Sequence, residues 1–307
     1  MKIRKQLFLS FLFITFFVPF FLSAQMKVLS GFEGGSYFQM ANELNMITDV
    51  ELKVIPTEGS RDNFFKLKSN NADIAFLQYD VLFYQTGYMK DESKSVKKMK
   101  ILLPLGYEEI HLITKKDSRI RTIKDLKRKK VGVGSKLQGT IVTSGYIRKK
   151  LNGKWKEVRI PFDDALESLE KGRIDAFFFV GSAPVKKLNT LTGSLKDNLK
   201  LIPITNPKLN DYYAKTTIKA GTYNWLNNDI ETYSVRYALV TNTINETIED
   251  KEYLRNLLDD IKNNIDVLKK DGHRMWGNVD FNFDRILWDI HPISVEIFNL
   301  EKKEHKF

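Results

Sequence analysis

Three short loops combine glycine with a hydroxyl side chain where a predicted strand gives way to a predicted helix. They are Gly34-Gly35-Ser36, Gly59-Ser60 and Gln138-Gly139-Thr140. Glycine lets main-chain N–H groups approach a ligand closely, and a helix start offers unpaired N–H donors at the positive end of its dipole. The pattern therefore predicts a site for a carboxylate or another small anionic group. Helix capping by the three hydroxyls is the alternative, and Glu33 nearby is either a partner for a cationic group or an exposed loop acid.

No set of residues indicates catalysis. The four histidines have none of the spacings typical of metal sites, and the chain has neither a GxSxG nucleophile elbow nor a phosphate-binding P-loop. Glu33 takes the place of the second glycine in a GxGxxG dinucleotide pattern. Asp73 and Asp175 are expected to hold turns between helix and strand, because both lie at the strand ends opposite the predicted ligand loops. We therefore expect no catalytic residue, no metal and no cofactor.

Two stretches about a hundred residues apart share one layout. In each, an amphipathic helix leads through a stop signal and an Asp into a strand apolar enough to be buried on both faces. The first runs from Asn63 to Gln78 and the second from Ala165 to Val180, and the second is followed by the loop Gly181-Ser182-Ala183-Pro184. Because ligands of open α/β sheets lie beyond the carboxyl ends of the strands, the repeat predicts two lobes facing one cleft. Chance recurrence of short αβ units is the alternative.

The remaining elements alternate between strand and helix, which is typical of an α/β protein. Strands are predicted at 27–30, 53–56, 109–114, 130–134, 158–161 and 233–240, and the chain from about Asp250 onward has apolar residues at helical spacing. We expect residues 25–110 and 235–307 to form lobe one, and residues 111–234 to form lobe two with its return connection. Two crossing segments, near Ile110–Ile113 and Arg236–Leu239, are expected to act as a hinge.

The N-terminus has the layout of a secretory signal peptide. A basic start is followed by an apolar run from Leu7 to Leu22 and a small residue, Ala24, at the expected cleavage position. An uncleaved membrane anchor is the alternative, although the run is short for a span and Pro19 interrupts it. The chain has no cysteine, so it offers no site for lipid attachment. We expect residues 1–24 to be removed and the mature protein to be periplasmic and soluble.

The basic composition has two interpretations. Of 49 Lys and Arg residues three lie in the leader, which leaves 46 against 38 Asp and Glu, a formal charge of about +8. Basic patches occur at 97–100, 127–130 and 148–150. They flank predicted helices and lack interleaved aromatic residues, so solvated helix faces are favoured over nucleic-acid binding. The excess of positive charge is suited to drawing anionic ligands toward a cleft.

A series of short motifs follows one order along the chain. It comprises Gly34-Gly35-Ser36-Tyr37, Glu58-Gly59-Ser60, Ala72-Asp73-Ile74-Ala75, Ile123-Lys124-Asp125-Leu126-Lys127, Val131-Gly132-Val133-Gly134, the module from Gly172 to Pro184, Ala220-Gly221-Thr222-Tyr223 and Ile290-His291-Pro292. The series resembles the TAXI family, the substrate-binding proteins of tripartite ATP-independent periplasmic (TRAP) transporters. The resemblance spans nearly the whole chain after the leader, and its specificity lies in the collinear set.

The resemblance implies a type II periplasmic-binding-protein fold, an α/β fold with two Rossmann-like lobes joined by a two-segment hinge. Together with the glycine loops, it gives a set of candidate ligand-binding residues: Gly35, Ser36, Tyr37, Gly59, Ser60, Asn63, Gln78, Gln138, Gly139, Thr140, Gly181, Ser182 and Tyr223. The family's Gly-Ser-Gly-Thr loop reads Leu137-Gln138-Gly139-Thr140 here, which leaves the ligand's identity open.

The predicted function follows from these expectations. The protein should capture a small anionic or zwitterionic solute, an organic acid or an acidic amino acid, by closing its lobes. It should then deliver the solute to the membrane permease subunits of a TRAP transporter. A ligand-binding sensor module for a signalling receptor is the alternative within binding proteins. An exported enzyme on the same scaffold is the alternative from another class.

Overall fold

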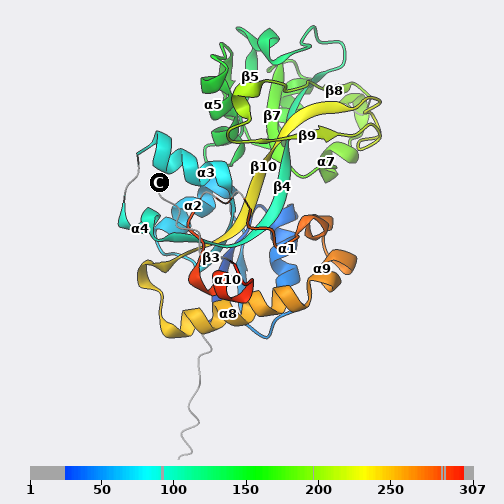
Figure 1. Cartoon of the computed structure of the whole chain (residues 1–307). Coiled ribbons are helices and arrows are strands. Elements are labelled where there is room, and N and C mark those ends of the chain that lie inside the picture. The colour runs from blue at the N-terminus through cyan, green and yellow to red at the C-terminus, as the bar shows by residue number, and fades with distance from the viewer. Residues whose placement is uncertain (1–24, 91–92, 196, 285, 287, 301–307) are drawn as a thin grey trace, which may run out of the picture.

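The computed structural model describes residues 25–90, 93–195, 197–284, 286 and 288–300. In this part of the chain two α/β lobes are joined by two long antiparallel strands, β4 (Met99–Lys115) and β10 (Ile230–Asn242), as Figure 1 shows. The predicted signal peptide lies outside the described residues. None of the described helices combines the length and the apolar character needed to cross a bilayer.

Lobe one is built on the strand order β2-β1-β3-β10-β4. Its three short strands, β1 (Met26–Leu29), β2 (Leu52–Ile55) and β3 (Ile74–Gln78), are parallel to one another. Its helices are α1 (Ser36–Leu44), α2 (Ser60–Lys68), α3 (Tyr79–Phe83), a π-helical turn (Tyr84–Tyr88), α4 (Lys94–Lys97), α8 (Ile248–Asn263), α9 (Ile265–Asp271) and α10 (Pro292–Ile297), with 3-10 turns at Thr243–Asn245 and Arg274–Asn278.

Helices cover both faces of the lobe-one sheet because its strand residues alternate between the faces. Ile74 and Phe76 pack into the core that contains α1 and α8, whereas Ala75 and Leu77 pack into the core that contains α2. Strand β3, to which these four residues belong, is buried along its whole length, as its apolar sequence predicted.

Lobe two repeats this design with β5 (Lys130–Gly132), β6 (Lys156–Val158) and β7 (Ala176–Gly181), and β5 is parallel to both neighbours. Antiparallel strands β8 (Leu199–Leu201) and β9 (Ala214–Ile218) pair with β4 and β10. Its helices are α5 (Thr140–Lys150), α6 (Phe162–Glu170) and α7 (Lys186–Asn189), with 3-10 turns at Ile123–Leu126, Gly193–Leu195 and Pro207–Leu209.

The two αβ modules predicted from the sequence occupy equivalent places in the two lobes. Helix α2 leads into β3, and α6 leads into β7. Asp73 accepts a hydrogen bond from the main-chain N–H of Lys27, and Asp175 accepts one from that of Lys130, at 2.6 and 2.8 Å. Each aspartate thus ties its turn to the start of a neighbouring strand, which confirms the predicted structural role.

Strands β4 and β10 change lobes within a few residues. On β4, Gly106 pairs with Tyr237 of β10, whereas Glu109 pairs with Gly181 of β7 in lobe two. On β10, Ser234 pairs with β9, whereas Tyr237 pairs with β3 of lobe one. The ladder is irregular there, because Gly106 has φ +153° and the register shifts just after Tyr237. The change of partner therefore lies before the expected segment Ile110–Ile113, which pairs with β7 inside lobe two.

A candidate ligand-binding cleft between the lobes

A cavity of about 380 Å³ lies between the lobes, at the carboxyl ends of the strands of both. The loops that follow β1 and β2, together with Gln78 at the end of β3, line it from lobe one, and the loops that follow β5 and β7 line it from lobe two. The structure brings most of the candidate residues together in this lining: Gly35, Ser36, Tyr37, Gly59, Ser60, Gln78, Gln138, Gly139, Thr140, Gly181 and Ser182. The three glycine loops recognised in the sequence thus line one cavity in the structure.

Asn63 and Tyr223 lie outside this lining, each behind one of the loops. The Asn63 amide donates to the carbonyl of Phe76 at 2.8 Å and accepts from the Thr57 hydroxyl at 2.6 Å. The Tyr223 hydroxyl accepts from the main-chain N–H of Val185 at 3.0 Å and lies 2.7 Å from Nε2 of His111. Both side chains are fully buried, so in this structure they support loops and do not face the cavity.

The hydroxyls of the glycine loops do not cap their helices. Gly35, Gly59 and Gly139 occupy the N-cap positions, and the hydroxyl residues that follow are the first helical residues. The Ser60 hydroxyl instead accepts the main-chain N–H of Gln78 at 2.7 Å, and the Thr140 hydroxyl accepts that of Val180 at 3.2 Å. Each hydroxyl joins a helix start to the adjacent strand while its own proton stays available for a ligand.

Glu108 lies at the base of the cleft, and no sequence motif indicates it. Its Oε2 accepts hydrogen bonds from the Tyr37 hydroxyl at 2.7 Å and from Nε2 of Gln78 at 2.8 Å. The carboxyl group is buried, and this burial raises the pKa of Glu108 to about 7 despite the two donors. Burial, followed by the nearby Glu108 carboxyl, also raises the pKa of Tyr37.

The Gln78 amide leaves one acceptor without a partner. Its NH₂ group faces Glu108, since the reverse orientation would place two oxygen acceptors against each other. Its Oε1 is buried, and no described residue donates a hydrogen bond to it. A buried acceptor without a donor costs about 1–3 kcal/mol. Gln78 lines the cleft, so a ligand that supplies an N–H donor would remove this cost.

The lobes touch across the cleft at Gly139. A Cβ atom on this glycine would lie 1.6 Å from Oε1 of Gln78 and 3.1 Å from Cβ of Ser60, both in lobe one. The main-chain N–H of Asp62 also donates to the carbonyl of Leu137 in lobe two at 2.9 Å. The structure is therefore a closed form, and the missing side chain of Gly139 permits this close approach.

Arg274 fastens the far side of the cleft. It lies in the 3-10 turn after α9 in lobe one, and its guanidinium donates to the carbonyls of Ser182, Ala183 and Pro184 in lobe two. The nitrogen–oxygen distance to Pro184 is 2.8 Å. A planar fork of N–H donors suits three carbonyls of one loop. No local pattern in the sequence indicates this role, because the contact joins residues 90 positions apart in the chain.

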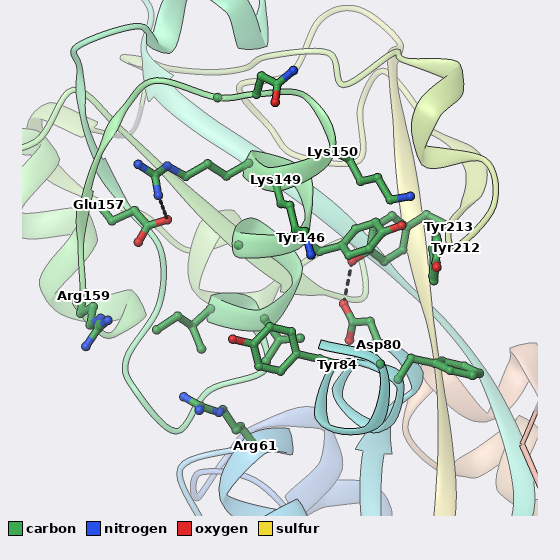
Figure 2. A pocket seen from close by; sticks show the side chains of 18 of the residues that line it. Arg61, Asp80, Tyr84, Tyr146, Lys149, Lys150, Glu157, Arg159, Tyr212 and Tyr213 are labelled. Atoms are coloured by element: carbon green, nitrogen blue, oxygen red, sulfur yellow. Dashed lines mark hydrogen bonds and ion pairs between the residues drawn. The ribbon is translucent and has the colours of Figure 1, made fainter. Parts of the chain in front are cut away.

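Asp80 forms a further connection between the lobes. Its Oδ2 accepts from the Thr143 hydroxyl at 2.6 Å and from the Tyr213 hydroxyl at 2.9 Å, both in lobe two. Figure 2 shows the hydrogen bond to Tyr213. Burial raises the pKa of Asp80 to about 6, although both hydroxyls favour the charged form. The closed form therefore holds two carboxyl groups, those of Glu108 and Asp80, away from water.

Replacing Gly139 with Ala should hinder closure without harming helix α5. Gly139 has helical φ and ψ of −65° and −33°, so Ala fits the local backbone, but its methyl group collides with the Gln78 amide. We expect Gly139→Ala to raise the radius of gyration measured by small-angle X-ray scattering. Gly145→Ala in the same helix meets no atom within 4 Å and should add about 1 kcal/mol of stability with the radius unchanged. An unchanged radius in Gly139→Ala would show that the lobes do not depend on this contact.

The raised pKa of Asp80 predicts how stability varies with pH. The folded protein keeps the Asp80 proton up to about pH 6, whereas the unfolded chain releases it near pH 4. This contribution to the unfolding free energy is complete below about pH 4 and is lost as the pH rises through 6, a change of about 2–3 kcal/mol. Urea unfolding of wild type and Asp80→Asn at pH 4 and pH 7 isolates it, since Asn cannot ionise. Equal pH dependence of the two proteins would contradict the assignment.

Comparisons with known proteins agree with this architecture. The sequence matches the NMT1-like family over residues 28–254. The structure is similar to a putative L-cystine ABC transporter from Listeria monocytogenes, with TM-score 0.51, 16% identity and coverage of 84% of this chain and 99% of that one. It is also similar to the GluR0 ligand-binding core from Nostoc punctiforme in complex with L-glutamate, with TM-score 0.50, 14% identity and coverage of 80% of this chain and 98% of that one. An ancestral arginine-binding protein bound to arginine is similar with TM-score 0.50 and 15% identity, and the match covers 82% of this chain and 95% of that one.

At these identities the similar structures establish the fold. It is the two-lobed α/β fold of type II periplasmic-binding proteins, as predicted. The family match is to NMT1-like proteins, and it does not show the TAXI family that the motifs resemble.

Proposed function

This chain belongs to the NMT1-like family, and from that premise and its cleft we propose that it is an extracytoplasmic binding protein for an amino acid. The observation that carries the proposal is the pair of acceptors at the base of the cleft, the Glu108 carboxyl and Oε1 of Gln78. An ammonium group satisfies both. It donates three hydrogen bonds, and its charge compensates a carboxylate that would otherwise be buried alone.

The same cleft also offers donors that suit the ligand's carboxylate. Helices α1, α2 and α5 begin at the cavity with glycine N-caps, and the hydroxyls of Ser60 and Thr140 are oriented by the strands behind them. Main-chain N–H groups, hydroxyl protons and the positive helix ends all favour an anion there. A cleft that offers both acceptors for an ammonium group and donors for a carboxylate suits a zwitterion.

This arrangement narrows the ligand class expected from the sequence. An organic acid with neither an amine nor a hydroxyl group would leave Oε1 of Gln78 unpartnered, and no organic acid without an amine would bring a positive charge to Glu108. Two of the similar structures, the GluR0 core and the ancestral arginine-binding protein, hold an amino acid. Their likeness to this chain supports the amino-acid class without indicating which side chain is preferred.

Lobe closure is the proposed binding mechanism. We take the two lobes as rigid units that rotate about the crossing strands β4 and β10; the unit of lobe one comprises residues 235–307 and the chain up to the change of partner in β4, a little before the expected boundary at residue 110. Only the closed form presents acceptors from lobe one and donors from both lobes to the same ligand, so the ligand shifts the equilibrium toward closure. Arg274 and Asp80 contribute contacts between the lobes that do not need the ligand.

The proposed destination of the ligand is a membrane permease. The TAXI resemblance favours the permease subunits of a TRAP transporter, whereas the Listeria structure is described as an ABC transporter protein. A signalling receptor is the alternative partner. Export to the periplasm rests on the signal-peptide pattern of residues 1–24.

Replacing Glu108 with Gln should discriminate between ligands with and without an amine. A thermal-shift screen of the twenty amino acids first identifies the tightest ligand. Glu108→Gln should weaken its binding by about tenfold to a hundredfold, the scale of a hydrogen bond to a charged group. Binding of the deaminated analogue, with the same carbon skeleton, should change little. Because burial raises the pKa of Glu108 to about 7, wild-type affinity for the amino acid should also be higher at pH 8 than at pH 6.

Glu33→Gln is the matched control, since Glu33 is an exposed acid that lines the same cleft. Calorimetry should find its affinity close to wild type. A loss of affinity in Glu33→Gln but not in Glu108→Gln would move the ammonium site to the rim. If Glu108→Gln lowered the affinity for the amino acid and for its deaminated analogue equally, the ligand's ammonium group would not lie at Glu108.

A further inference from the structure

A second cavity between the lobes, which we call the basic groove, is larger than the ligand cleft and separate from it. Its volume is about 1060 Å³, and in the described part of the chain it shares no lining residue with the cleft. Figure 2 shows its walls, which come from the α3 region of lobe one and from α5 and the chain around β6 in lobe two. Nothing in the proposed ligand binding requires this cavity.

Basic side chains dominate the groove. Arg148 and Glu157 form an ion pair at 3.4 Å, and Asp80 is engaged by Thr143 and Tyr213. Six further basic residues line the groove: Arg61, Lys136, Lys149, Lys150, Lys154 and Arg159. Among the described residues, no carboxylate forms an ion pair with Lys136, Lys154 or Arg159, and all three are exposed. The groove therefore carries an excess of positive charge that an acidic partner would neutralise.

The patch 148–150, expected from the sequence to be a solvated helix face, lines this groove beside aromatic rings. The rings of Tyr146 and Tyr212 lie 4.6 Å apart, and Nζ of Lys150 lies 5.5 Å and 5.1 Å from their centroids. Tyr212 is 51% exposed. Tyrosine and arginine are enriched at protein–protein interfaces, because they combine contact area with directed hydrogen bonds.

The shape of the groove depends on closure. Arg61 of lobe one donates to the carbonyl of Lys136 in lobe two at 2.7 Å, at one side of the groove. Asp80 of lobe one accepts from Tyr213 of lobe two inside it (Figure 2), and from Thr143 of the same lobe. When the lobes separate, these contacts break and the two walls part. A partner that fits the groove thereby distinguishes the closed form from the open one.

We propose that the basic groove is the docking site for an acidic segment of the membrane protein that receives the closed, loaded binding protein. This inference rests on the proposed function, since it assumes a partner that reads closure. A concave cavity between two lobes accommodates a chain segment, whereas a flat bilayer surface would contact only its rim. Exposed tyrosine beside lysine and arginine also fits a peptide carrying carboxylates better than a small inorganic anion.

Fluorescence anisotropy with a labelled hexaglutamate peptide tests the proposal, with hexaglutamine as the uncharged control. Lys154→Glu/Arg159→Glu should weaken hexaglutamate binding by about tenfold or more, because it reverses two groove charges. Lys269→Glu/Lys270→Glu makes the same change of net charge on the exposed end of α9 and should weaken binding by about twofold at most. Gly139→Ala should weaken peptide binding as well, because it keeps the lobes apart.

Three outcomes would overturn the proposal. Equal loss in the two double variants would show a response to net charge alone. Failure of hexaglutamate to bind the wild-type protein would show that the groove does not bind an acidic segment. Binding to phosphatidylglycerol vesicles, lost in Lys154→Glu/Arg159→Glu while hexaglutamate binding is unaffected, would assign the groove to the membrane surface. The amino-acid thermal shift should persist in both double variants; its absence in wild type would reject the proposed function independently of the peptide result.

Discussion

Two carboxyl groups are buried between the two lobes that strands β4 and β10 connect, and this constraint governs the cleft. Glu108 and Asp80 each obtain two hydrogen bonds, yet burial still raises the pKa of both. A buried carboxyl must be protonated, paired with a cation or returned to water. Opening the lobes supplies water, and a ligand ammonium at Glu108 supplies the cation. The energetics of closure are thereby linked to what the cleft contains.

Burying the two carboxyl groups opposes closure, whereas Gly139 makes closure sterically possible because it has no side chain. The same short loop provides the N-cap glycine of α5 and the Thr140 hydroxyl. One segment therefore permits close approach, presents helix-end donors and orients a hydroxyl. Lobe one has its counterpart in Gly59 and Ser60, which lie directly across the cleft. The chemistry of the site follows from placing equivalent strand-to-helix loops face to face.

Local patterns predicted the fold class and much of the cleft lining. Gly59-Ser60 and Gly139-Thr140 are recognisable because glycine and hydroxyl residues at a strand-to-helix junction have a local physical meaning. Glu108 and Arg274 were not recognisable, because their roles depend on partners distant in sequence, such as Tyr37 and Ser182. The first half of β4 was missed for a local reason: Pro104 and Gly106 interrupt the strand pattern, and only the structure shows that β10 and the register shift accommodate them.

The central claim is that an amino acid lies between the lobes with its ammonium group on Glu108. A crystal structure of the protein grown with a mixture of the twenty amino acids tests this claim most directly. The account predicts density for one amino acid in the cleft, with its nitrogen within hydrogen-bonding distance of the Glu108 carboxylate and Oε1 of Gln78, and its carboxylate at Ser60 and Thr140. An amino acid in the reverse orientation, or one bound outside this cleft, would contradict the account.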